Sequence, residues 1–199
     1  MSDVVIVSAT RTPVGSFNGS FSDISAADLG SIAIKEAINR AKIKTSDVSE
    51  VIMGQVLTAS CGQNPARQAS INAGIPNEIT AFTINQVCGS GLRSIALGWQ
   101  SIMNNESEIV IAGGQENMTQ APHCFHLRQA GKLGDAEMID SMIKDGIWDI
   151  FNGYHMGITA ENVAEKWQIT RDQQDEMALN SQLKAEEAQK NGKFQKEIV

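Results

Sequence analysis

A cysteine stands at a chemically significant place in this 199-residue chain, within the segment NQVCGSGL at residues 85–92. Apolar and β-branched residues from Ile79 to Asn85 predict a buried strand before Cys88, and an apolar stripe after it predicts a helix. Such a turn places the thiol at a helix N-terminus, whose partial positive charge favours a thiolate. Because the thiolate is a nucleophile, we expect covalent acyl transfer at Cys88.

Two glycines, Gly89 and Gly91, stand beside this cysteine. Glycine lets a substrate approach the backbone, whose N–H groups can stabilise an oxyanion during acyl transfer. The alternative is an ordinary buried thiol at the junction of two elements, since free cysteine is among the most buried residue types. Position alone leaves both interpretations open.

Apolar periodicity predicts the elements that would position Cys88. The run VVIVSA, Val4 to Ala9, predicts a first strand covered on both faces. The further predicted elements are helices over about 25–41, 65–73 and 92–103, and strands over 51–55, 79–85 and 108–114. This βαβαβαβ alternation predicts a layered α/β core with an open, largely parallel sheet.

The periodicity weakens after about Met118. We therefore expect an α/β domain over residues 1–117 and an incomplete loop-and-helix insertion over 118–199, with helices beginning near Thr159 and Thr170. The closing KEIV resembles the first residues of another strand, so we expect the chain to continue or to pair with a second chain.

The composition excludes several classes of protein. A formal net charge of -7 with scattered positive charges argues against nucleic-acid binding, although a local site could still hold a small anion. Three cysteines are a small and odd number, which does not fit a secreted domain stabilised by several disulfide bonds. Without a basic leader or a membrane-length apolar run, we expect a cytoplasmic protein that does not contact a membrane.

Five segments together resemble the thiolase family in order and spacing and cover essentially the whole chain. They are VSATRTPVGSFNGSF at 7–21, GQNPARQA at 62–69, NQVCGSGL at 85–92, AGGQENM at 112–118 and GYHMGITAENVA at 153–164. The resemblance implies the thiolase fold, in which two similar α/β halves form a layered core and a loop domain is inserted in the first half. This chain would be the first half with most of that insertion.

The resemblance also implies a reaction and site residues. Cys88 would form an acyl-enzyme with a coenzyme A thioester as substrate, with no bound cofactor. GYHMG resembles the biosynthetic branch, the acetyl-CoA acetyltransferases, which reversibly condense two acetyl-CoA to acetoacetyl-CoA and CoA. His155 and Met156 would line a short acyl pocket, and Ile147 stands where the family usually has a leucine that contacts the coenzyme. The alternatives are core packing for Met156 and Ile147 and a structural histidine at His155.

Three further thiolase motifs do not occur in the sequence: a GHP-type histidine, an NEAF-type asparagine and a second catalytic cysteine. A nucleophile needs a general base, so we expect this chain alone to be inactive and to need a C-terminal thiolase half as its partner. The resemblance further implies a homo-oligomer, a dimer or tetramer joined through a loop that runs from about His123 to about Gly146.

Two other classes of protein and one metal site are the competing interpretations. A β-ketoacyl synthase would need a different cysteine motif, whereas a non-catalytic thiolase-like subunit or lipid-binding module stays open. The cluster HCFH, His123 to His126, invites a metal interpretation. A structural zinc site needs four ligands, usually as two spaced pairs, so we expect no metal there.

Overall fold

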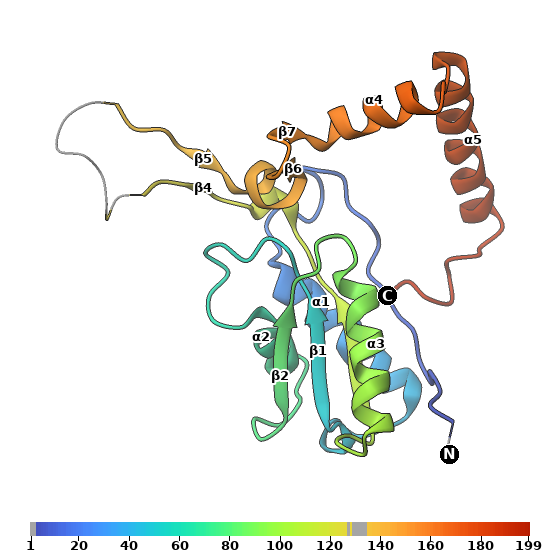
Figure 1. Ribbon diagram of the computed structural model, residues 1–199. Coiled ribbons are helices and arrows are strands. Elements are labelled where there is room, and N and C mark those ends of the chain that lie inside the picture. The colour runs from blue at the N-terminus through green and yellow to red at the C-terminus, as the bar shows by residue number, and fades with distance from the viewer. Residues whose placement is uncertain (1–2, 127, 129–134) are drawn as a thin grey trace. The chain divides into compact units, whose positions relative to one another are not determined.

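The computed structural model describes residues 3–126, 128 and 135–199 (Figure 1). These residues form two compact units. One comprises the described residues up to Gly146 together with Val199, and the other is Ile147–Ile198. Cys88 belongs to the first unit.

A three-stranded parallel sheet forms the centre of the first unit. Its strands are β1 (Glu50–Gly54), β2 (Thr80–Ile84) and β3 (Val110–Gly114), in the order β2-β1-β3. The register is even, so that the carboxyl ends of all three strands lie at one edge of the sheet. The predicted parallel α/β arrangement is therefore confirmed.

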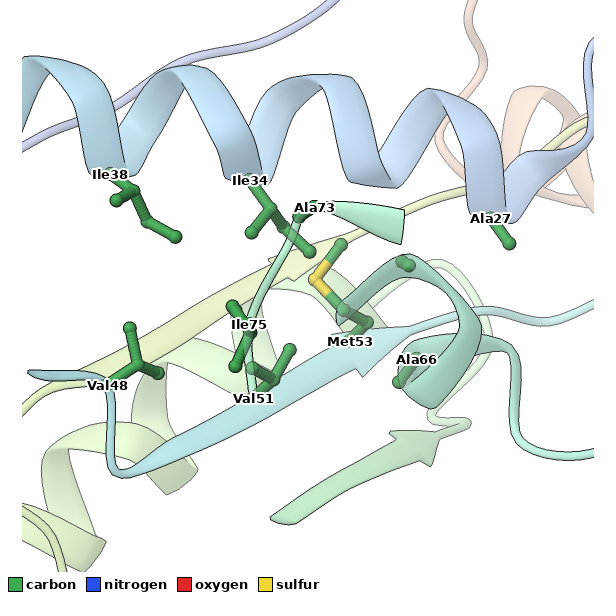
Figure 2. Close-up of a cluster of buried hydrophobic side chains, with 10 residues drawn as sticks. Ala27, Ile34, Ile38, Val48, Val51, Met53, Ala66, Ala73 and Ile75 are labelled. Carbon is green, nitrogen blue, oxygen red and sulfur yellow. The ribbon is translucent and has the colours of Figure 1, made fainter. Parts of the chain in front are cut away.

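Helices cover both faces of this sheet. They are α1 (Ala26–Ala41), α2 (Pro65–Asn72) and α3 (Ser90–Met103). Side chains alternate along a strand, so Val51 and Met53 of β1 share one face and join the apolar cluster with α1 and α2 (Figure 2). Gly54 points to the opposite face, where it meets the start of α3. The central strand thus connects the core to the cysteine turn.

Local sequence explains where the helices begin and how closely α3 approaches the sheet. Ser25 caps α1 by accepting a hydrogen bond from the backbone N–H of Asp28 at 3.0 Å. Pro65 starts α2 at the first helical position, which suits a residue without an N–H. The buried face of α3 carries only small residues, namely Ser90, Ser94, Gly98 and Ser101. Their size lets the helix lie close against β1 and β3.

Short elements complete the two units. In the first unit these are the 3₁₀-helices η1 (Thr45–Asp47) and η2 (Met118–Gln120) and the antiparallel pair β4 (His123–Cys124) and β5 (Ile139–Asp140). The π-helix η4 (Met142–Ile147) leads into the second unit, which holds β6 (Trp148–Asp149), β7 (Tyr154–His155), α4 (Met156–Lys166) and α5 (Arg171–Lys190). Thr170 and Gln173 form a capping box at the start of α5.

The predicted first strand at Val4–Ala9 is wrong. Residues 3–10 have no strand structure, and Val5, Ile6 and Val7 are 69%, 75% and 70% exposed. An apolar run indicates a preference for burial, but a strand also needs a neighbour for its backbone N–H and C=O groups. Within the described residues, β2 and β3 pair only with β1, so the sheet has three strands instead of the four predicted.

The division between compact units also falls at a different place from the predicted domain boundary. The segment after residue 117 stays with the first unit because its side chains bond back to the N-terminal loop. Thr119 Oγ1 accepts from the backbone N–H of Asn18 at 2.9 Å, and Gln120 Nε2 donates to Ser22 O at 2.9 Å. Whether residues 118–199 form one inserted domain stays a prediction. Of the loop predicted to join subunits, residues 127 and 129–134 lie outside the described residues.

Within the residues that the structure describes, no helix combines the length and the apolar character needed to cross a membrane.

Candidate active site

Cys88 lies in the turn that joins β2 to α3. Strand β2 ends at Ile84, helix α3 begins at Ser90, and the free thiol of Cys88 is exposed. In open α/β sheets, ligands bind outside the carboxyl ends of the strands, which is the edge where this turn lies. The predicted strand-turn-helix geometry is confirmed, and the chemical role of Cys88 stays a prediction.

The start of α3 is open to an approaching group. Its N-cap is Gly89, and among the described residues no side chain caps this helix. Two backbone hydrogen bonds help to close the turn, from Gly89 N to Gln86 O and from Ser90 N to Val87 O, both at 3.1 Å. An uncapped helix N-terminus favours negative charge, such as a thiolate or the oxyanion of a thioester under attack.

Three glycines allow the turn to lie directly on the sheet. A Cβ added to Gly54 would lie 2.6 Å from the backbone carbonyl carbon and the Cβ of Ser90. A Cβ on Gly114 would lie 3.4 Å from the Cα of Gly91. Larger residues at the ends of β1 and β3 would therefore push the start of α3, and Cys88 with it, away from the sheet.

A layer of polar side chains supports the same edge of the sheet. Gln55 and Gln115 follow β1 and β3, are both buried, and are joined by a hydrogen bond of 2.9 Å from Gln115 Nε2 to Gln55 Oε1. Glu116 Oε2 accepts from the backbone N–H of Val56 at 2.8 Å, and Glu116 Oε1 accepts from that of Leu57 at 3.3 Å. Burial raises the pKa of Glu116, and these backbone hydrogen bonds oppose part of that rise. The layer holds the loop after β1 in place.

The other predicted site residues lie in the second unit. Ile147 ends η4 and is half-buried, and His155 pairs with Trp148 across the β6–β7 hairpin. The hairpin therefore brings Ile147, His155 and Met156 together. Cys88, in contrast, belongs to the first unit.

His155 has a structural task in its own unit. It is the N-cap of α4, and its Nδ1 accepts a hydrogen bond from the backbone N–H of Gly157 at 2.9 Å. An accepting Nδ1 requires the neutral ring with the proton on Nε2. His155 and Met156 are both exposed, so Met156 does not pack in the core of its own unit. Substrate contacts of Ile147, His155 and Met156 stay predictions.

In the described part of the chain, no group of three or more His, Cys, Asp or Glu side chains that could hold a metal ion gathers at the HCFH cluster or elsewhere. His123 pairs with Asp140 across β4 and β5, and the distance from His123 Nε2 to Asp140 Oδ2 is 3.8 Å. Cys124 is a half-buried free thiol.

A small pocket of about 190 Å³ in the first unit does not include Cys88 among its lining residues. Cys61, Gln55 and Gln68 are among its lining residues. These groups bond to one another and to the local backbone, as in the 2.8 Å hydrogen bond from Gln68 Nε2 to Cys61 O. The pocket is smaller than the roughly 300–1,000 Å³ of ordinary ligand sites. We therefore place the candidate site at the cysteine turn.

Residues 4–199 match the family profile described as "Thiolase, N-terminal domain". The chain belongs to the thiolase family.

Curated relatives make the similarity more specific. The chain is 60% identical over 196 residues to an acetyl-CoA acetyltransferase of Rhizobium meliloti (strain 1021), an alignment covering 98% of this chain and 50% of the relative. It is 59% identical over 199 residues to an acetyl-CoA acetyltransferase of Paracoccus denitrificans, with 100% and 51% covered. A cytosolic acetyl-CoA acetyltransferase of Rattus norvegicus is 55% identical over 196 residues, with 98% and 49% covered. The chain spans about half the length of the curated relatives it matches.

Proposed function

We propose that this chain supplies the nucleophilic half of an acetyl-CoA acetyltransferase, which condenses two acetyl-CoA to acetoacetyl-CoA and CoA. The observation that carries the proposal is an exposed cysteine at the uncapped start of α3, in a chain whose relatives bear that enzyme name. The name of the rat relative, a cytosolic enzyme, supports a cytoplasmic location.

The proposed reaction has two steps at Cys88. The thiolate attacks the carbonyl carbon of acetyl-CoA, the carbon–sulfur bond to CoA breaks, and CoA leaves with a proton from a general acid. A second acetyl-CoA then loses an α-proton to a base, and its carbanion attacks the acetyl group on Cys88. Acetoacetyl-CoA leaves as the Cys88 thiolate re-forms, and the reverse sequence is thiolysis.

A C-terminal thiolase half is the proposed source of the acid and the base. The histidine, asparagine and second-cysteine motifs of the family do not occur in the 199 residues. His155, Met156 and Ile147 are proposed to line the short acyl pocket and to contact the coenzyme, with no bound cofactor. Assembly into a dimer or tetramer belongs to the same proposal.

A chimera tests the proposal directly. Joining Val199 to the second half of the Rhizobium meliloti relative, to which this chain is 60% identical, should give thiolysis of acetoacetyl-CoA by CoA. Replacing Cys88→Ala in the chimera should lower kcat by at least about a thousandfold, because the acyl-enzyme cannot form. The 199-residue chain alone should show no turnover.

Two results would overturn the proposal. Turnover that survives Cys88→Ala would show that Cys88 is not the nucleophile. A folded, CoA-binding chimera without turnover would favour a non-catalytic thiolase-like module.

A further inference from the structure

Val87, the residue before Cys88, has a backbone conformation that its side chain disfavours. Its φ of 49° lies in the left-handed region, which is a genuine outlier for a β-branched residue. Among the described residues, the non-glycine residues with positive φ are Asn18, Lys42, Ser60, Asn64, Val87, Asn105 and Gln168, so Val87 is the only β-branched one. Its side chain is 47% exposed, so burial in the core does not explain the conformation.

Two side chains bond to the backbone on either side of Val87. Asn85 Oδ1 accepts a hydrogen bond from Val87 N at 2.8 Å. Ser90 Oγ donates to Val87 O at 2.6 Å and also accepts from Gln86 N at 2.8 Å. Both polar backbone groups of Val87 are therefore held by side chains.

The sheet anchors these two side chains. Ser90 is only 4% exposed and is wedged against Gly54 at the end of β1. Asn85 Nδ2 lies 3.5 Å from Val56 O, in the loop that follows the same strand. The position of the turn is thus tied to β1 through Ser90 and, more weakly, through Asn85.

We propose that Asn85 and Ser90 are positioning residues for Cys88, acting through Val87. Together they keep Val87 left-handed, and this conformation sets the direction of the next peptide and places the thiol at the open start of α3. Without them Val87 relaxes to negative φ and carries Cys88 away from the helix N-terminus. The inference rests on the proposed nucleophilic role of Cys88.

Site-resolved alkylation of the 199-residue chain tests this inference. Iodoacetamide is applied near neutral pH, and mass spectrometry follows Cys88 with Cys61 and Cys124 as internal references. Ser90→Ala and Asn85→Ala should each slow alkylation of Cys88 by about fivefold, because the turn then no longer holds the sulfur at the open start of α3. Asn85 is exposed, so its variant should fold even if Ser90→Ala is unstable.

A matched control separates positioning from stability. Ser101 is another buried serine of α3, and its Oγ bonds Glu50 Oε2 at 3.2 Å and Ser107 Oγ at 2.9 Å. It lies about 16 Å along the helix from Ser90, at 1.5 Å per residue. Ser101→Ala should lower the midpoint temperature of unfolding without slowing the alkylation of Cys88.

Glycine at position 87 gives a rescue that a merely structural role would not produce. Glycine adopts positive φ without a steric penalty, so the turn no longer needs both side chains. In the Ser90→Ala background, Val87→Gly should return the Cys88 rate to within about twofold of the unmodified chain.

The outcomes distinguish this inference from the proposed function. If Cys88 of the unmodified chain reacts no faster than Cys61 and Cys124, the inference fails, whereas the proposed nucleophile fails only if turnover of the chimera survives Cys88→Ala. If Cys88 reacts fast but neither variant slows it, only the positioning role is overturned. The positioning role alone is also overturned if Ser101→Ala slows alkylation of Cys88 equally, or if Val87→Gly does not restore the rate.

Discussion

At the scale of single residues, Glu116 makes stability depend on pH. Burial raises the pKa of this carboxyl, so between the ordinary and the raised value the folded chain binds more protons than the unfolded chain. The contribution of Glu116 to the free energy of unfolding therefore falls as pH rises through that window. At neutral pH this contribution is therefore lower than at acidic pH.

Glu116→Gln should remove this pH dependence. The free energy of unfolding of the unmodified chain, minus that of the variant, should decrease as pH rises from about 4 to 7 in urea titrations. A difference that increases with pH would contradict the prediction.

Glu36→Gln provides a control of opposite sign. The hydrogen bond from Arg40 lowers the pKa of Glu36, so its contribution is present above the ordinary carboxyl value and is lost as pH falls. The same subtraction for Glu36 should therefore increase with pH. Because Glu36 is a surface group, the effect should be small.

Residue types allowed Cys88 and its turn to be predicted, but not the way the turn is held. A cysteine among glycines between a strand and a helix has recognisable chemistry. The left-handed Val87 could not be predicted, because valine itself disfavours that conformation. In the sequence, Asn85 and Ser90 are only an asparagine and a serine near a turn, where both residue types are common.

At the scale of elements, the contact between β1 and α3 depends on Gly54. A methyl group at Gly54 would lie 2.6 Å from backbone and side-chain carbons of Ser90, and a buried helix start cannot move aside freely. Gly54→Ala should therefore lower the free energy of unfolding by about 1–3 kcal/mol, the usual range for overpacking. Urea unfolding followed by circular dichroism measures the change.

Gly113→Ala is the matched control for this prediction. Gly113 lies opposite Met53 in the same sheet, and an added Cβ would meet Met53 Sδ at 3.6 Å, an ordinary contact. Its effect should stay within about 0.5 kcal/mol. Equal losses for the two variants would show that the close approach of α3 is not the cause.

Helices and central strands were predictable because pattern and neighbours agree. Strand β1 has both of its partners in the first unit, and α1 covers Ala26–Ala41, close to the predicted 25–41. The run Val4–Ala9 shows where pattern is insufficient. Its apolar residues indicate a preference for burial, whereas strand formation depends on a partner that sequence periodicity does not identify.

At the scale of the whole molecule, α3 is apolar on the side away from its sheet. Leu92, Ile95 and Trp99 are 76%, 41% and 52% exposed, and their spacing puts them on one face of the helix. The opposite face carries the small buried residues that contact β1 and β3. A helix that packs one face on its sheet and carries an apolar stripe on the other is typical of a position between two layers. We expect the proposed second thiolase half to cover this face.

Hydrogen exchange tests that expectation by comparing the 199-residue chain with the chimera described above. Amides of α3, residues 90–103, should exchange at least about tenfold more slowly in the chimera, because covering Leu92, Ile95 and Trp99 makes local opening less favourable. Amides of α1, whose buried face already packs in the core of Figure 2, should change by less than about twofold. A chimera that turns over without added protection of α3 would place the second half on another face. Equal protection of α1 and α3 would indicate general stabilisation of the first unit instead of a cover over α3.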